Sequence, residues 1–350
     1  MIVQWGIGVL FGLIILKLIW PGLHNGFGLM LAAGFVGGHG TAAAVGEAFS
    51  GHGWEDAATL AMTSATVGII VAIVGGIILI NRSARKGETN FIKDYNQLPV
   101  ELRTGLISAS KRKSLGDDTV SSISIDPLIL HLAVVLLATI GGYYLSDYGS
   151  QIFPQVTLPA FSVAFIVALI MQRILVVTKA VHYFDKRIVN RISGSATDLL
   201  VVFGIASIQL PVVIKYATPL IFLLVFGILY CYICFKLLGP RMLREFWFEK
   251  SIFSWGWMTG TMAMGIALLR IVDPDLKSRT LDDYALAYVP MAPVEILVVT
   301  FSPLMMVSGQ HWLFVVITFG FALAIFIFAL WRGWWSKDIN LKQTGGTRSN

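Results

Sequence analysis

The run Gly37-Gly38-His39-Gly40-Thr41 lies inside a stretch, residues 25–49, that is too apolar for a soluble loop and too rich in glycine for an ordinary helix. Each glycine in a helix interior costs about 1 kcal/mol relative to alanine, so a plain helix is disfavoured here. Irregular backbone survives in a membrane only where it lines a cavity or is buried in protein. The stretch therefore predicts a broken, re-entrant hairpin over about residues 25–49. The alternative is that these glycines only let helices pack closely.

The composition of the chain indicates a polytopic membrane protein. Hydrophobic residues make up 56% of its 350 residues, charged residues make up 13%, and the mean hydropathy is +0.76. Apolar runs of about 20 residues are long enough to cross about 30 Å of hydrocarbon. The net charge of +6 belongs mostly to loops and the tail, so nucleic acid is not an expected partner. We expect spans near residues 1–20, 58–80, 127–147, 156–178, 196–214, 217–236, 284–303 and 311–331.

The distribution of basic residues predicts the orientation of these spans. The polar stretch 81–125 is rich in Lys and Arg, including Lys93, Arg103 and Lys113, and is therefore expected to be a cytoplasmic linker. Arg270 and Arg279 stay on the same side as the linker only if residues 251–270 dip into the membrane and return. By the same argument residues 50–56, which contain no Lys or Arg, are outside. We therefore predict two re-entrant hairpins, about 25–49 and about 251–270, that enter from opposite faces.

The second hairpin is predicted to be a copy of the first. Residues 55–68 align without gaps over residues 282–295, and each copy follows a Gly-Thr pair, Gly40-Thr41 or Gly260-Thr261. Duplication with opposite orientation is how many transporters build a site at the centre of the bilayer. The predicted fold is thus an all-α polytopic membrane protein, an inverted-repeat transporter with two re-entrant hairpins and an incomplete first repeat.

The expected organisation has four parts. These are a first repeat (1–80), a cytoplasmic linker (81–125), a second repeat (126–303) and an extra C-terminal span with a basic tail (304–350). Compared with the second repeat, the first lacks about three spans. We expect an upstream start before Met1, a fragmentary chain, or a partner subunit that supplies these spans.

The candidate binding residues are those that a broken helix exposes or that lie beside it. A half-helix N-terminus suits a carboxylate, and exposed carbonyls suit Na⁺. His39 is expected to bind a ligand, to move a proton or to cap the broken backbone. The hydroxyls either reach the site or bond their own helix. Glu295 should face a cavity, be protonated, or lie shallower in the membrane than the span suggests. The predicted substrate and cation site consists of Gly37, Gly38, His39, Gly40, Thr41, Thr63, Ser64, Thr66, Thr259, Gly260, Thr261 and Glu295, with close backbone approach expected at Gly40.

These residues resemble the bacterial sodium/glutamate symporter family. The Gly-rich GGHGT re-entrant loop of that family resembles Gly37 to Thr41, and the helix that follows it resembles residues 56–76 (DAATLAMTSATVGIIVAIVGG). The resemblance implies Na⁺-coupled import of L-glutamate or a related organic anion across the bacterial inner membrane. It implies no cofactor other than Na⁺ as the coupling ion. Trp255, Trp257 and Met258 stand in the second hairpin where the family has small residues.

The expected function is a carrier that works by alternating access, and two further classes of function are alternatives to it. The chain is alternatively a channel or a non-transporting membrane scaffold that kept the fold after its second hairpin degenerated. An enzyme is not expected, because no paired carboxylates, nucleophile elbow or metal-ligand cluster stands at membrane depth. A homo-oligomer is also an expectation. Cys231 and Cys234 are expected to be packing residues.

Overall fold

The computed structural model describes residues 1–91, 104–112, 114–152, 160–243 and 245–335, and all regular structure in these ranges is helical. By length and composition alone, nine helices of this described part qualify as membrane spans, which indicates a multi-pass membrane protein. They are α1 (Ile2–Phe11) with its continuation to Ile19, α5 (Asp56–Arg85), α7 (Pro127–Ile152), α8 (Ala160–Val177), α9 (Lys186–Ala206), α11 (Ala217–Ile233) with its continuation to Met242, α13 (Trp247–Val272), α14 (Thr280–Val307) and α15 (His311–Trp331). Shorter helices are α2 (Lys17–Ile19), α3 (Leu29–Gly34), α4 (Gly38–Ser50), α10 (Leu210–Lys215) and α12 (Gly239–Met242).

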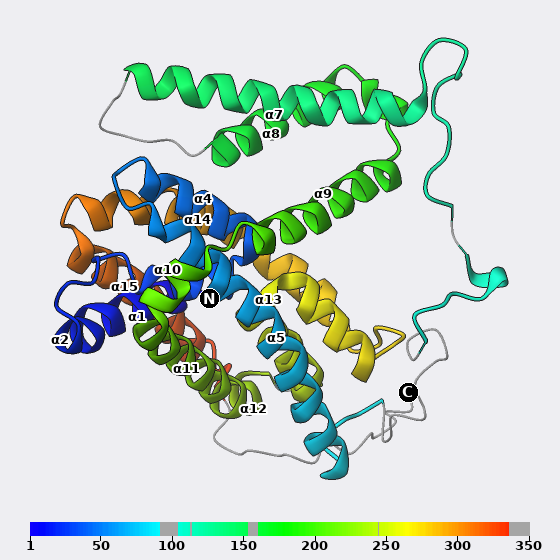
Figure 1. The fold of residues 1–350 in the computed structure, drawn as a ribbon. Helices are drawn as coiled ribbons and strands as arrows, with labels where there is room; N and C mark the ends of the chain where they lie inside the picture. Colours follow the sequence, from blue (N-terminus) through cyan, green and yellow to red (C-terminus); the bar gives the residue numbers. More distant parts are fainter. Residues whose placement is uncertain (92–103, 113, 153–159, 244, 336–350) are drawn as a thin grey trace.

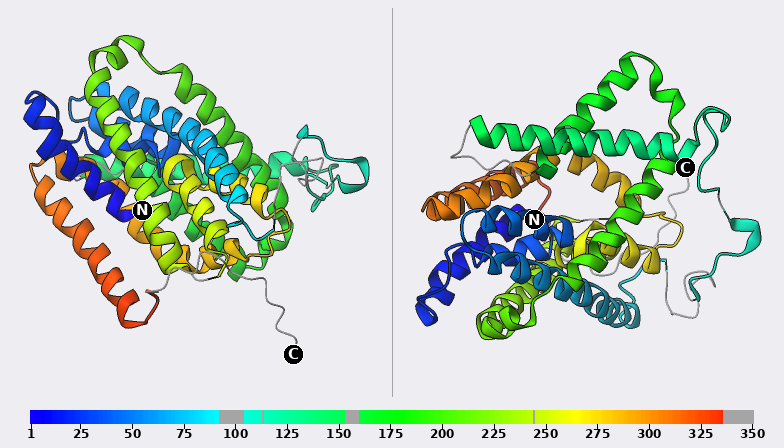
Figure 2. Two further views of the ribbon diagram at one scale, coloured as in Figure 1. Left: turned by 90° about the horizontal axis from the view of Figure 1, so that it is seen from below. Right: turned by 45° about the horizontal axis from the view of Figure 1, so that its top comes forward.

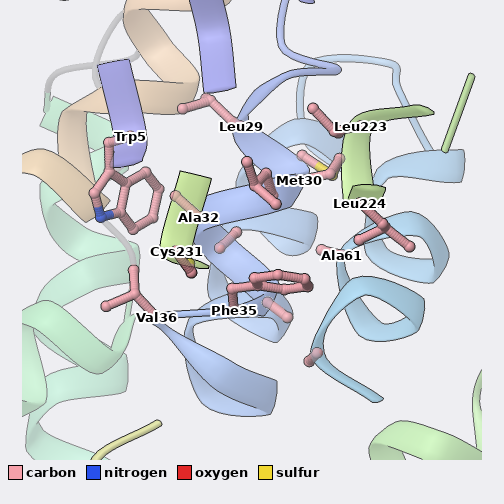
Figure 3. Close-up of a cluster of buried hydrophobic side chains, with 14 of the residues drawn as sticks. Trp5, Leu29, Met30, Ala32, Phe35, Val36, Ala61, Leu223, Leu224 and Cys231 are labelled. Atoms are coloured by element: carbon pink, nitrogen blue, oxygen red, sulfur yellow. The ribbon is translucent and has the colours of Figure 1, made fainter. Parts of the chain in front are cut away.

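The buried core lies among α1, α3, α4, α5, α11 and α13. Trp5, Phe35 and Leu223 come from three different parts of the chain. They are almost completely buried and belong to the same cluster of hydrophobic side chains (Figure 3). Within a bilayer, such contacts stabilise by close packing rather than by removal from water, because lipid tails are themselves apolar. This core holds α3, α4 and α13, which carry the predicted hairpins.

Helices α7 and α8 form a pair beside this bundle, and α9 leads from the pair back to α4 and α5 (Figure 1; Figure 2). The pair is close: a Cβ on Gly142 would lie 2.3 Å from the Cα of Ala164. Large apolar side chains such as Leu137, Ile166 and Val202 are exposed on these three helices. Exposed apolar residues of this kind suit contact with lipid.

Glycines set the crossing of α1 with the start of the first hairpin. A Cβ on Gly8 would lie 2.6 Å from the carbonyl oxygen of Gly28, and a Cβ on Gly12 would lie 3.0 Å from the Cα of Gly28. Gly8 and Gly12 form a G-x-x-x-G pattern, which in membrane helices permits close backbone contact. α1 is thereby held against the element that carries Gly37 to Thr41.

The expected span at residues 196–214 is wrong. The helix begins earlier, at Lys186, because the Asp185 carboxylate accepts a hydrogen bond from the backbone N–H of Arg187 and caps the N-terminus. It ends at Ala206, and Pro211 then stands in the first turn of a separate helix, α10, where its fixed φ is favourable. Apolar content alone therefore misplaced this span by about two turns at its end and by nearly three at its start.

The linker and the tail are described only in part. Lys93, Arg103 and Lys113 of the basic linker, and residues 336–350 of the tail, lie outside the described residues. Where the linker is described, it contacts the bundle: Asn90 donates from its backbone N–H and from its side-chain amide to the Glu249 carboxylate, at 2.8 and 2.9 Å. The linker is thus attached to the first turn of α13. The cytoplasmic orientation of the linker stays a prediction.

Candidate functional site

Helix α13 is broken in its middle and doubles back on itself. Gly260 and Thr261 have non-helical backbone angles, with φ of −148° and 81°. A Cβ on Gly256 would lie 2.7 Å from the Cα of Gly265. In a straight helix these two residues would be about 13 Å apart. α13 therefore consists of two antiparallel limbs joined by a tip at Gly260 and Thr261.

The segment 25–49 is also a helical hairpin, whose limbs are α3 and α4. At the turn between them the N–H of Gly37 donates to the carbonyl of Ala32, at 3.0 Å, and Gly38 has φ of +68°, which glycine adopts at little cost. The far ends of the two limbs come together, because a Cβ on Gly26 would lie 2.4 Å from Cζ of Phe49. The Gly-rich run thus forms the tip of this hairpin.

The tips of the two hairpins touch each other. A Cβ on Gly38 would lie 2.2 Å from Cγ2 of Thr261, so a larger residue at position 38 would displace the opposite tip. Gly40 differs, since a Cβ there would meet only Leu200 at 3.4 Å, an ordinary van der Waals distance. Close approach is therefore found at Gly38 and not at Gly40, where we had expected it.

Helix α5 forms a wall shared by both hairpins (Figure 1). A Cβ on Gly34 of the first hairpin would lie 2.4 Å from Cβ of Ser64 on α5. On the same helix, a Cβ on Gly68 would lie 2.3 Å from the carbonyl oxygen of Thr259, next to the tip of the second hairpin. Trp255 adds a hydrogen bond from its indole N–H to the Ala72 carbonyl at 3.3 Å. Both tips are therefore positioned by one helix.

His39 lies at the first tip, buried, with one ring nitrogen paired and one not. The Thr66 hydroxyl donates to the carbonyl of Met62 at 2.9 Å, so it accepts from Nε2 of His39 at 3.2 Å. Nδ1 is buried and has no hydrogen-bond partner among the described residues. A buried polar atom without a partner costs about 1–3 kcal/mol, which a polar ligand at the tip would offset.

Gln4 is a residue of the site that sequence analysis missed. It is completely buried on α1, and its side-chain amide donates to the carbonyl of Met258 at 3.0 Å, just before the break in α13. Its Oε1 is buried and unpartnered among the described residues, and the thiol of Cys231 lies close to its amide nitrogen. The signal was present in the sequence, because Gln4 is the one polar side chain between Met1 and Lys17.

The hydroxyls predicted for the site bond mainly to their own helices, which was one of the two expectations for them. Thr63, Ser64 and Thr259 donate to the carbonyls four residues earlier, at 2.7, 3.0 and 2.7 Å. The side chain of Thr41 packs on Gly37, where a Cβ would lie 2.4 Å from Cβ of Thr41. Within the predicted set, the tips bring together Gly38, His39, Thr66, Thr259, Gly260 and Thr261.

Glu295 lies elsewhere, on α14. Its carboxylate accepts a hydrogen bond from the hydroxyl of Tyr288 at 2.9 Å. It lines a cavity with Trp5 and Trp257, and none of the other predicted residues forms part of that cavity's wall. The sequence therefore identified a carboxylate that faces a cavity, but this cavity is not formed by the tips.

Four helix ends lie at the contact between the tips. α4 and the second limb of α13 begin there, and their N-termini carry partial positive charge. α3 and the first limb of α13 end there, and helix C-termini carry partial negative charge on their last carbonyls. The arrangement offers backbone N–H groups to an anion and carbonyl oxygens to a cation at the same place.

A family model described as sodium/glutamate symporter matches residues 1–243. The match includes the first hairpin, α5 and α11, and it ends just before α13. No curated protein and no solved structure matches the chain.

Proposed function

The chain belongs to the sodium/glutamate symporter family, and on this premise we propose that it is a Na⁺-coupled secondary transporter that imports L-glutamate or a related organic anion. It is a multi-pass membrane protein of a transporter family rather than of an enzyme family. The proposal places the site where the two hairpin tips meet.

One observation carries this proposal: the tip of the first hairpin touches the tip of the second, at Gly38 and Thr261. Near this contact lie two buried polar atoms that have no hydrogen-bond partner in the described part of the chain, Nδ1 of His39 and Oε1 of Gln4. Buried polar groups are rarely left unpaired unless a ligand, ion or water meets them. Helix N-termini at the tips suit the substrate carboxylates, and the carbonyls at the helix C-termini suit Na⁺.

The proposed mechanism is alternating access by an inverted repeat. We propose that the hairpins are re-entrant, that they enter from opposite faces, and that each is followed by its own long helix, α5 or α14. Relative motion of the two repeats would expose the tips to one side of the membrane and then to the other. The bacterial inner membrane is the proposed location, and a homo-oligomer or a partner subunit stays a prediction.

A second candidate, a non-transporting scaffold, is favoured by one finding. The family match ends at residue 243, so the second hairpin lies beyond it, and there the chain has Trp255, Trp257 and Met258 where the resemblance implies small residues. Bulky residues at this position would restrict the space for a substrate. A channel is the remaining alternative.

Uptake by the purified protein in proteoliposomes distinguishes these functions. Labelled L-glutamate is offered outside, with an inward gradient of Na⁺ in one sample and of K⁺ in its control. We expect saturable uptake that requires Na⁺. Uptake that rises linearly with concentration in both samples would indicate a channel, and absence of uptake with intact folding, shown by a cooperative thermal transition, would indicate the scaffold.

A further inference from the structure

A second polar feature lies beside the second hairpin, in the cavity that contains Glu295. The cavity has a volume of about 180 Å³. That is larger than the space of about 30 Å³ that one water occupies, and it is comparable to cavities of about 150 Å³ that hold benzene. Its wall includes Trp5 of α1, Trp257 of α13, and Tyr284, Tyr288 and Glu295 of α14.

Three aromatic rings of this wall, those of Trp257, Tyr284 and Tyr288, are in contact with one another. The rings of Trp257 and Tyr284 have centroids 4.6 Å apart at an angle of 87°, and those of Trp257 and Tyr288 are 5.6 Å apart at 71°. Tyr284 and Tyr288 stack at 5.2 Å. Aromatic rings carry negative potential on their faces, so a group of them around a cavity attracts a cation.

Glu295 gives the cavity its single formally charged side chain. Tyr288 donates to Oε2 of Glu295 at 2.9 Å, which holds the carboxylate in one orientation, and the residues that line the cavity include no Lys, Arg or His. Apart from the tyrosine hydroxyls, the indole N–H groups and Met1 with its α-amino group, the wall is apolar. A small inorganic cation such as Ca²⁺ or Mg²⁺ needs about six oxygen ligands, more than this wall provides. An alkylated ammonium, which aromatic cages bind, fits both the charge and the lining.

The cavity also lies on the part of α13 that leads to the tip of the second hairpin, because Trp257 in its wall is three residues, about one turn, before Gly260. Trp5 and Trp257 line the cavity, and their sequence neighbours Gln4 and Met258 form the hydrogen bond next to the break in α13. A ligand with an ammonium group in the cavity would therefore have the rest of its length close to the tips, where helix N-termini are available for carboxylates.

We propose that this cavity is a binding site for an organic ammonium group. If the proposed function holds, on which this second assignment rests, the group is the amino group of the transported amino acid. The site then selects amino acids over dicarboxylates that lack an amino group.

The first experiment measures binding without transport. Radiolabelled choline is bound to the purified protein in nanodiscs and is displaced by 3,3-dimethylbutan-1-ol, an uncharged molecule of nearly the same shape. We expect choline to bind about tenfold more tightly than the uncharged molecule, a preference that Glu295→Gln removes. Glu47→Gln, which changes an exposed carboxylate on α4, is the matched control and should leave the preference unchanged. Equal affinity for both molecules, or a preference that survives Glu295→Gln, would overturn the proposal.

A second variant guards against loss of the fold. Tyr284→Leu removes one ring but leaves Glu295 and Tyr288 in place, so choline affinity should fall several-fold while the thermal transition of the protein is retained. Unchanged choline affinity in Tyr284→Leu would contradict a role of the aromatic rings in binding the ammonium group.

The N-terminus provides an alternative occupant, because Met1 lines the same cavity. The titration is therefore repeated on protein acetylated at its α-amino group. Choline binding of equal strength in both forms supports a ligand site. Binding that is seen only after acetylation would show that the amino group of Met1 itself occupies the cavity, and it would overturn the ligand assignment.

The second experiment tests the amino-group assignment in transport. Glutarate has the carbon chain of glutamate without the amino group. In Glu295→Gln we expect the KM for L-glutamate to rise about tenfold and the inhibition constant of glutarate to stay the same. If both constants rise equally, the amino-group assignment fails although transport stands. If the wild-type protein shows no uptake but prefers choline as described, the proposed function fails and the ammonium site stands.

Discussion

Gly38 and Thr261 meet tip to tip: a Cβ on Gly38 would lie 2.2 Å from Cγ2 of Thr261. Both residues also have positive φ, +68° for Gly38 and 81° for Thr261. The positive φ of Thr261 costs energy because threonine is β-branched, and such strain persists only where the surroundings enforce it. The contact is therefore a specific feature of the packed hairpins.

Gly38→Ala is expected to disrupt the contact between the hairpin tips. The alanine would adopt an unfavourable positive φ, which costs about 1–2 kcal/mol, and its methyl group would meet Thr261. We expect Na⁺-dependent uptake to fall at least about tenfold, a loss equivalent to about 1.4 kcal/mol. Initial rates of uptake in proteoliposomes provide the measurement.

Gly40→Ala is the matched control, since its methyl group would have an ordinary contact with Leu200 at 3.4 Å. It should retain most of the wild-type rate. The double variant Gly38→Ala with Thr261→Ser, which removes Cγ2, should recover part of the loss. Equal effects of the two glycine substitutions would contradict the importance of the contact.

Gly68→Ala should destabilise the packing of the second hairpin on α5. The new methyl group would lie 2.3 Å from the carbonyl oxygen of Thr259, which is backbone and cannot rotate away. Overpacking of this kind typically costs about 1–3 kcal/mol, so the thermal transition in detergent should fall by several degrees.

Gly194→Ala on α9 is its control. No atom lies within 4 Å of a Cβ placed there, and alanine is favoured over glycine in a helix by about 0.5–1 kcal/mol. This variant should match or exceed the wild-type transition temperature. A drop similar to that of Gly68→Ala would show that the loss does not arise from the contact with Thr259.

Gln4→Met keeps the size of the side chain but removes the donor to Met258. The Met258 carbonyl would keep only the weak thiol donor of Cys231 at 3.8 Å, and losing the amide in a buried position costs about 1–3 kcal/mol. We expect a lower transition temperature and slower uptake. Gln151→Met, which removes an exposed amide that donates to Asp147 at 3.0 Å, should change stability by less than about 0.5 kcal/mol. Wild-type behaviour of Gln4→Met would exclude this role for Gln4.

Asp185 should make the attachment of the linker depend on pH. Backbone N–H groups of Arg187 and Asp117 donate to its carboxylate, each at 2.7 Å, and they lower its pKa from 3.8 to about 2. The folded state therefore favours the anion. Its contribution to stability is complete above the ordinary pKa and is lost as the pH falls toward about 2.

Asp185→Asn tests this dependence. The wild-type protein should be more stable than the variant at pH 7, and the difference in transition temperature should shrink as the pH falls below about 4, near the ordinary pKa of 3.8. A difference that stays constant down to pH 2.5 would show that the charge of Asp185 is not what holds the linker.

The sequence predicted the membrane class and the interruptions of helix at Gly37 and at Gly260, because these depend on local chemistry, whereas the re-entry of the hairpins from opposite faces stays a prediction. Glycines at 37, 38 and 40 and the charges around residue 270 are visible in the chain itself. Which glycine makes the tight contact was not predictable, since Gly38 and Gly40 differ only in what the other hairpin places beside them. The role of Gln4 and the aromatic cage around Glu295 likewise depend on helices that are distant in sequence.

The start of α9 was missed for a different reason. Hydropathy places a span where residues are apolar, whereas the helix begins where Asp185 caps it, and polar residues such as Lys186 and Arg187 then belong to its first turn. Capping is a matter of backbone N–H groups and is independent of apolar content.

The intimate fit of α5 with both hairpins limits how the protein can move. A Cβ on Gly75 or Gly76 would collide with Trp255 or Leu268, while a Cβ on Gly46 would collide with Ala58 nearer the start of the same helix. Sliding both hairpins past α5 at once would break all of these contacts together. In the proposed transport cycle, α5 would therefore move as one body with one hairpin and slide against the other hairpin. The boundary between the moving and the fixed part of the molecule would then run along one face of this helix.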